Sequence, residues 1–412
     1  MELDSLPADA AQTEHEVEAF EAADEYHAAM VKAERILDDD ALHEYLQART
    51  NELLVERGLE EDSIRVFVVK NPYMNASMLA NGVIHLHTGI LARIENEAQL
   101  ATLLGHEIGH HVLRHVAREE LSRQREESRA TWTRVAVAVV LAPTGLSPLA
   151  FIDIETKGMD GVLARQMSGY SRAFETEADR YGFEVMQAAG YPVDQSAAFF
   201  QRMIDVEEAT RAELNVGEAP EDPYVYASHP KLTARKASYE QLIAEGRTGC
   251  EVEDAGCASD EAEPGSGSEA SQEERYMARM EAAVLDAARA DRAIGRRLAA
   301  IAILDRLLAF QSESVDAWEL LGSIRSARGS RSDEIPEAIE ALERAAELDP
   351  ERATVRRELG FLYQNTDRPV EAASSFRAYL DAEPEARDAK IIQRFIDEAD
   401  EQAAGKSNGE SS

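Results

Sequence analysis

Two histidines four residues apart define the chemistry that this sequence could perform. His106 and His110 lie in a stretch whose apolar residues recur at helical spacing, and Asn96 is a suitable N-cap. Residues four apart on a helix leave the same face, so both imidazoles could bind one metal ion. Glu107 lies beside them, where its carboxylate could take a proton from water activated by that metal. Because such a pentapeptide can arise by chance, a third ligand is needed to support the site.

A candidate third ligand occurs in a second, acidic segment. Residues 170–180 read YSRAFETEADR, and Ser171 can cap a helix on which Glu175 and Asp179 share one face. Glu175 would complete a His2Glu donor set with one open position, as in catalytic zinc sites. Asp179 would orient a ligand imidazole through its other ring nitrogen. Alone, these carboxylates would indicate a solvated acidic face, but together with the histidine pair they predict one zinc ion per chain.

The paired segments HEIGH and YSRAFETEAD resemble the motifs of the HExxH/ExxxD gluzincin metalloproteases, the family of the CAAX prenyl endopeptidases and HtpX-like proteases. The chain is most similar to a soluble branch, the β-barrel-assembly-enhancing proteases, which carries C-terminal tetratricopeptide (TPR) repeats. The resemblance implies a zinc metalloendopeptidase. The zinc ligands that it implies are His106, His110 and Glu175, with Glu107 as general base and Asp179 as the residue that orients a ligand.

The resemblance also assigns roles to residues with weaker signals. Asn75 and Ala76 match a family position that contacts the substrate backbone. His229 and Arg235 begin and end an HPxxxxR element that reaches the metal site in the family. His229 could donate a hydrogen bond to a developing oxyanion, with Arg235 helping to hold the charge. Alternatively it could occupy the fourth metal position as a displaceable regulatory ligand, which is the role we expect, or it could be purely structural.

The remaining histidines near these motifs are expected to be structural. His111 and His115 form a second pair four residues apart, but they lie round the helix from the ligand face. His85 and His87 alternate with apolar residues in a predicted strand.

A small sheet is expected before the histidine helix. Residues 64–69 are rich in β-branched side chains, and residues 78–80 and 83–87 flank Asn81-Gly82, a strong hairpin signal. An extended peptide could add to the edge of such a sheet. The predicted fold class is therefore mainly α with a small β-sheet, a gluzincin metalloprotease domain followed by a C-terminal TPR α-solenoid.

A pattern that repeats after 34 residues indicates the solenoid. TPR repeats use small residues at helix crossings so that paired helices stack, and the alternative is an arbitrary helical bundle. We expect the repeats to recruit protein partners or substrates. The matching positions are Ala338, Leu342 and Pro350 in one copy and Ala372, Phe376 and Pro384 in the next.

Composition divides the 412 residues into five regions. A Gly-, Ser- and acid-rich stretch reads as an unpacked linker between two folded parts. The predicted regions are an acidic N-terminal helical region (1–57), the zinc metalloprotease domain (58–245), an acidic Gly/Ser linker (246–275), TPR-like helical repeats (276–400) and a disordered tail (401–412).

The net charge of −36, from 79 acidic and 43 basic residues, argues against nucleic acid or an anionic membrane surface as a partner. The most apolar run, residues 135–142, is interrupted by Pro143 well short of the roughly 20 residues of a membrane span. No stable span is therefore expected. Cys250 and Cys257 could form a disulfide or remain free thiols.

The predicted function is a zinc-dependent endopeptidase acting on misfolded or stalled proteins, by resemblance those of a bacterial envelope. One alternative is a chaperone or assembly factor with a largely silent or autoinhibited metal site, and another is a cytoplasmic quality-control peptidase. Residues 1–31 contain no signal-peptide pattern, so we expect a periplasmic or envelope-associated protein if a leader was removed, and otherwise a cytoplasmic one.

Overall fold

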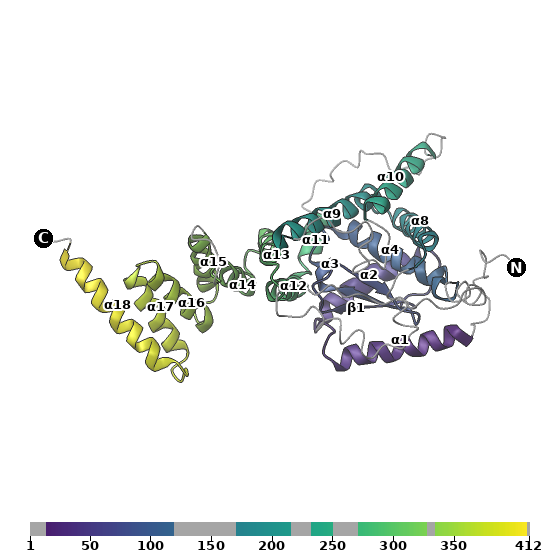
Figure 1. The fold of residues 1–412 in the computed structure, drawn as a ribbon. Helices are drawn as coiled ribbons and strands as arrows, with labels where there is room; N and C mark the ends of the chain where they lie inside the picture. The colour runs from purple at the N-terminus through teal and green to yellow at the C-terminus, as the bar shows by residue number, and fades with distance from the viewer. Residues whose placement is uncertain (1–13, 119–169, 216–231, 250–270, 328–333, 410–412) are drawn as a thin grey trace. The chain divides into compact units, whose positions relative to one another are not determined.

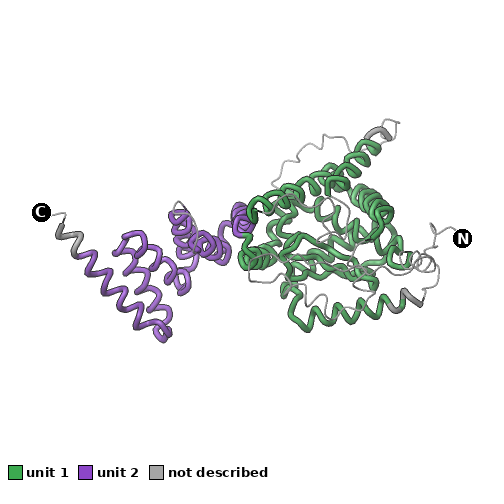
Figure 2. The backbone as a smooth tube through the Cα atoms, viewed as in Figure 1, with its two compact units in different colours: residues 1–296 green, residues 297–412 purple. Residues whose placement is uncertain are grey.

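The computed structural model describes residues 14–118, 170–215, 232–249, 271–327 and 334–409. The chain divides into two compact units, Met1–Arg296 and Arg297–Ser412, which are described separately (Figure 2). The described helices of unit 1 are α1 (Glu14–Lys32), α2 (Asp40–Val55), α3 (Thr88–Leu91), α4 (Glu97–Val112), α8 (Arg172–Ala188), α9 (Asp194–Leu214), α10 (Leu232–Gly249), α11 (Gln272–Met277) and α12 (Glu281–Ala293).

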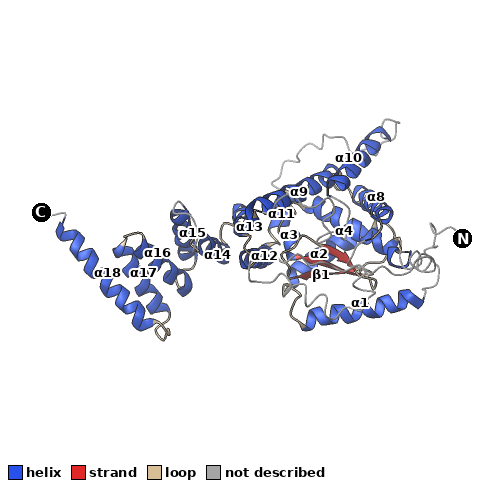
Figure 3. Cartoon of the chain, viewed as in Figure 1, coloured by secondary structure: helices blue, strands red, loops and turns tan. Residues whose placement is uncertain are grey.

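Unit 1 is built on a three-stranded sheet (Figure 3). Its strands are β1 (Arg65–Val69), β2 (Ala76–Met78) and β3 (Val83–His87), with β3 in the centre, parallel to β1 and antiparallel to β2. The predicted hairpin joins β2 to β3: Gly82, at a φ of +77°, donates its backbone N–H to the carbonyl of Leu79 at 3.1 Å. A glycine adopts this left-handed conformation without steric cost.

Helices cover the sheet on both sides (Figure 1). α1 packs on one side through an apolar stripe that includes Ala23, Tyr26 and Met30, which meet Val69 and Val83 of the strands. α2 contacts β1 and α4 contacts β2 from the other side. The helix with the HEIGH motif therefore lies directly beside the edge strand β2.

α4 and α8 approach each other unusually closely because glycines line their crossing. A Cβ atom added to Gly105 of α4 would lie 3.0 Å from the Cα of Gly182 in α8, and one added to Gly182 would lie 2.7 Å from the backbone nitrogen of His106. Similarly, a Cβ on Gly109 would lie 3.2 Å from the Cα of Ala178. Where Gly105 and Gly182 face each other, only residues without a side chain permit this backbone contact, which brings the two motifs together.

The two helices after the predicted linker belong to unit 1. α11 contacts α4, and α12 contacts α3. Arg93, which is only 1% exposed, forms a 2.6 Å ion pair with Asp291, and Arg296 binds the other oxygen of that carboxylate at 2.7 Å. Tyr276 donates a 2.6 Å hydrogen bond to the carbonyl of Leu91. These helices were predicted to belong with the repeats, whereas in the structure they pack on the elements that carry the metal motifs.

The described residues of unit 2 form paired helices. Gly322 lies against Leu342 and Gly360 against Phe376, where an added Cβ would come within 2.5 and 2.4 Å of the facing side chain. Small residues therefore occupy the crossings, as the repeat pattern predicted. The helices are α13 (Arg297–Phe310), α14 (Val315–Arg325), α15 (Ile335–Leu348), α16 (Ala353–Asn365), α17 (Pro369–Ala382) and α18 (Ala389–Gly409).

The mainly α architecture with a small sheet is confirmed. Among the described helices, none combines the length and the apolar character needed to cross a bilayer. The predictions that fall outside the described residues concern the apolar run 135–142, His229, and the cysteines Cys250 and Cys257.

Candidate metal centre

α4 holds the first two candidate ligands on a buried helix. Its N-cap is Asn96, whose side chain accepts a 3.0 Å hydrogen bond from the backbone N–H of Gln99. His106 and His110 are at most 1% exposed, and their Nε2 atoms lie 3.0 Å apart. Both imidazoles therefore direct the same nitrogen toward one point.

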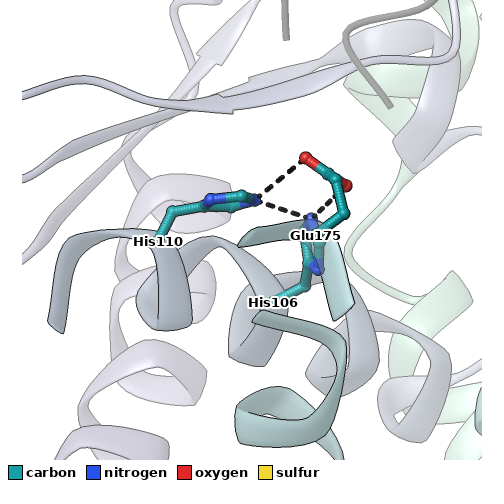
Figure 4. Close-up of side chains that lie close together, drawn as sticks. All are labelled: His106, His110 and Glu175. Atoms are coloured by element: carbon teal, nitrogen blue, oxygen red, sulfur yellow. Dashed lines mark hydrogen bonds and ion pairs between the residues drawn. The ribbon is translucent and has the colours of Figure 1, made fainter. Parts of the chain in front are cut away.

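Glu175 faces that point from α8 (Figure 4). Ser171 caps α8 by accepting a hydrogen bond from the N–H of Phe174. The Glu175 oxygens then lie 3.6 Å from Nε2 of His106 and 3.5 Å from Nε2 of His110. Ligand atoms at about 2.0–2.2 Å from a tetrahedral zinc ion lie roughly 3.3 Å from one another. The donor types and their separations thus fit one such ion.

Glu107 directly follows His106 in α4, and one oxygen of its carboxylate is unsatisfied. Its side chain is buried, and Oε1 has no hydrogen-bond partner within the described ranges. A buried polar atom without a partner is costly, so such an atom indicates a water or ligand that completes its bonding. This environment fits the general-base role, which stays a prediction.

Asp179 supports His106 from the side away from Glu175. Its Oδ1 lies 2.9 Å from Nδ1 of His106. Burial alone would raise the pKa of the Asp179 carboxyl, but the Arg235 charge and the hydrogen bonds from His106 and Arg235 hold that pKa well below its usual range. The ionised carboxylate keeps the proton of His106 on Nδ1 and leaves Nε2 free for a metal.

Arg235 lies behind His106 rather than at its metal-facing nitrogen. Two of its guanidinium nitrogens bind the carboxylate of Asp179, and the guanidinium packs 4.6 Å from the ring centroid of Phe200. Its Nη2 is 2.9 Å from Nδ1 of His106. This position does not support the expected role at an oxyanion, because the charge faces the opposite side of the imidazole. Arg235 instead neutralises Asp179.

His115 also contacts the cluster, although the sequence predicted no role for it there. Its Nδ1 lies 2.8 Å from Nδ1 of His110, and its Nε2 lies 3.4 Å from Oε2 of Glu177. Arg118 binds both oxygens of Glu177, at 2.6 and 3.1 Å. No local sequence pattern marks this contact, because it depends on Arg114 taking a left-handed conformation, with φ at 53°, just after α4.

The candidate substrate-binding residues lie at the start of the edge strand. Ala76 pairs with Leu86 in the register of β2 and β3, and the carbonyl of Asn75 accepts a 3.1 Å hydrogen bond from the N–H of His87. Their role toward a substrate stays a prediction. His229 lies outside the described residues, so its two alternative roles also stay predictions.

Two parts of the chain match known protein families. The family described as Peptidase family M48 matches residues 40–242, which include the cluster, and the family described as Tetratricopeptide repeat matches residues 326–397.

Individual relatives match part of the chain. A beta-barrel assembly-enhancing protease of Yersinia pestis is 30% identical over 173 residues, or 41% of this chain and 34% of the relative. The mitochondrial metalloendopeptidase OMA1 of Bos taurus is 30% identical over 186 residues, or 45% of this chain and 34% of the relative. The matches thus span about a third of the length of these relatives. Among solved structures, the crystal structure of MamA protein matches 32% of this chain and 78% of its own at 20% identity, with a TM-score of 0.25.

Proposed function

Because the chain carries a peptidase family M48 domain followed by a tetratricopeptide-repeat region, we propose that it is a zinc-dependent endopeptidase whose repeats bind protein substrates or partners. The observation that carries this proposal is the buried His106–His110–Glu175 cluster with the unsatisfied carboxylate of Glu107 beside it.

Each residue of the cluster has a defined task in peptide hydrolysis. When bound, zinc would polarise the scissile carbonyl and lower the pKa of a water molecule. His106, His110 and Glu175 would hold it. Glu107 would accept the proton of the attacking water and deliver it to the leaving amine, as a general base and then a general acid.

The substrate class that we propose is extended or unfolded protein. β2 is one of the two edge strands of the sheet and lies against α4, so a peptide could pair with its backbone near the cluster. Backbone pairing requires little of the peptide's sequence, which suits a protease of misfolded or stalled proteins. The paired helices of unit 2 add a surface of the kind that binds protein.

We propose that the protein is periplasmic or associated with the bacterial envelope. The name of the Yersinia pestis relative refers to assembly of β-barrels, which are the spanning structures of outer membranes. A cytoplasmic quality-control peptidase is the alternative. An assembly factor with a silent metal site is a second alternative, but the unsatisfied Glu107 favours a working peptidase.

Metal analysis combined with degradation of casein by wild type and Glu107→Gln tests the proposal. Wild type should contain about one zinc per chain and degrade casein, whereas Glu107→Gln should keep the zinc and lose proteolysis because only proton transfer is removed. Glu175→Gln should lose zinc affinity itself. Full proteolysis in the Glu107→Gln variant would contradict the mechanism, and wild type without zinc would contradict the metal assignment.

The role of His229 needs a separate test. Replacement by Ala should raise basal cleavage if the imidazole is an inhibitory fourth ligand, as we propose. Loss of an oxyanion donor should instead lower kcat by about a hundredfold or more. An unchanged rate with unchanged zinc affinity would assign His229 a structural role.

A further inference from the structure

His115 lies directly behind one of the two ligand histidines. α4 ends at Val112, and the left-handed conformation of Arg114 (φ 53°) returns the chain toward the helix. Nδ1 of His115 then lies 2.8 Å from Nδ1 of His110. His115 is 0% exposed, so the protein surrounds this contact.

One proton lies between these two nitrogens, and metal binding decides which histidine carries it. A nitrogen that binds a metal must be unprotonated, so neutral His110 would carry its proton on Nδ1. Nδ1 of His110 is then the donor and Nδ1 of His115 the acceptor. Consequently, His115 must carry its own proton on Nε2.

Glu177 and Arg118 favour that arrangement. Nε2 of His115 faces Oε2 of Glu177 at 3.4 Å, and an ionised carboxylate can only accept a hydrogen bond. Arg118 binds both oxygens of Glu177 and so fixes the carboxylate. The two hydrogen bonds therefore point in the same direction: His110 donates to His115, and His115 donates to Glu177.

Aromatic rings hold the two imidazoles in place. Phe174 stacks on His115 with the ring centroids 4.6 Å apart and the planes at 12°, and the Arg118 guanidinium lies 4.5 Å from the centroid of the same Phe174 ring. Tyr170 stacks on His110 at 4.1 Å and 18°. Both aromatic residues come from the segment that supplies Glu175, so one stretch provides a ligand and the packing that orients another.

We propose that His115 is a positioning residue of the metal centre, accepting the Nδ1 proton of His110 and holding that ligand in the metal-binding tautomer. The inference rests on the zinc site proposed above. The two ligand imidazoles are then supported differently, His106 by the ionised Asp179 and His110 by a neutral imidazole. A carboxylate partner raises the basicity of a ligand histidine. His115 therefore orients His110 while raising its basicity less than a carboxylate would.

Replacing His115 by Leu and by Asn tests this role. Zinc affinity is measured by competition with a chromophoric chelator, and ligand geometry by the absorption spectrum of the cobalt-substituted protein. His115→Leu should lower zinc affinity about 10- to 100-fold and shift the cobalt bands, as loss of a residue that orients a ligand does. Asn can place Oδ1 where His115 has Nδ1, so His115→Asn should recover most of the affinity and the wild-type spectrum.

Two further variants complete the design. His111→Leu makes the same change at a neighbouring histidine that is not part of the His110–His115–Glu177 hydrogen bonds. It should leave zinc affinity and the cobalt spectrum unchanged. Glu177→Ala should shift the cobalt bands in the same direction as His115→Leu but less, and it changes a side chain that is 40% exposed rather than fully buried.

The outcomes separate this inference from the proposed function. Wild type that binds no zinc would contradict the proposed function. Wild type that binds zinc, with affinity and spectrum unchanged in His115→Leu, would contradict only the role of His115, as would an Asn variant as defective as the Leu variant. If His115→Leu does not fold, an unchanged cobalt spectrum in Glu177→Ala would overturn the inference.

Discussion

At the scale of single residues, one turn and a half of α8 supports both candidate ligand histidines of α4. Glu175 faces the two Nε2 atoms, Asp179 binds the far side of His106, and Glu177 binds the histidine behind His110. Glu175 and Asp179 are four apart and share a face, whereas Glu177 lies on the flank. This geometry explains why alternate acidic residues in the segment have different partners.

Asp179→Asn should damage both the metal site and the fold. Loss of the carboxylate that orients His106 should lower zinc affinity about 10- to 100-fold. It also leaves the buried Arg235 guanidinium without its anionic partner, which should lower the free energy of unfolding by roughly 3–5 kcal/mol. Chelator competition and denaturant unfolding of the metal-free protein measure the two effects. Asp205→Asn, at an exposed position of α9, is the control, and equal values in both variants would contradict the prediction.

Acid should destabilise unit 1 through two histidines of β3. Burial lowers the pKa of His85 to about 3 and that of His87 to about 4. Between about pH 6.5 and 4 the unfolded chain therefore binds protons that the folded chain does not, so the free energy of unfolding falls as the pH falls, by up to about 1.4 kcal/mol per pH unit for each histidine. Urea unfolding at pH 7, 6 and 5 should show this slope, and His87→Gln should reduce it. A slope equal to that of wild type in His87→Gln would argue against this source.

At the scale of elements, the glycine crossing of α4 and α8 should be intolerant of a methyl group. In Gly182→Ala the new Cβ would meet the backbone of His106 at 2.7 Å, so the helices must separate. Overpacking of this kind costs about 1–3 kcal/mol, and the shift should also weaken zinc binding. Thermal unfolding and chelator competition measure both effects.

Gly246→Ala in α10 is the matched control. An added Cβ there would have only the Gln187 side chain within 4 Å, at 3.9 Å, and alanine favours helix by up to about 1 kcal/mol. It should therefore be neutral or stabilising. Equal melting temperatures for the two variants would mean that the crossing can relax.

The elements show which features the sequence could reveal. The three clustered ligands, the caps Asn96 and Ser171, and the Asn81-Gly82 hairpin follow from local spacing and were predicted. The return of the chain after α4 was not, because an arginine rarely adopts a positive φ and nothing local marks it. The packing of α11 and α12 on α3 and α4 was also missed, since it depends on partners nearly 200 residues away in sequence.

At the scale of the whole molecule, the compact unit that carries the metal motifs ends at Arg296. A chain ending at 296 should bind zinc and unfold cooperatively. A chain ending at 275 lacks Asp291, so the buried Arg93 guanidinium loses the carboxylate with which it forms an ion pair, which should cost roughly 3–5 kcal/mol. Zinc content and urea unfolding of the two truncations measure the difference. The full-length Asp291→Asn variant should show the same direction of change, and a stable, zinc-bound 1–275 chain would return the boundary to the predicted linker.

The contact between Gly105 and Gly182 also limits how this centre could be moved to another protein. Ordinary helix pairs have axes 8–10 Å apart, a spacing set by the side chains between them. A designer who grafted only the two histidines and the glutamate onto such a pair would place the carboxylate too far from the imidazoles. The feature that must be transferred is the backbone contact itself. His106 is adjacent to Gly105, and Glu175 lies two turns before Gly182. A scaffold that accepts both glycines can accept the ligands.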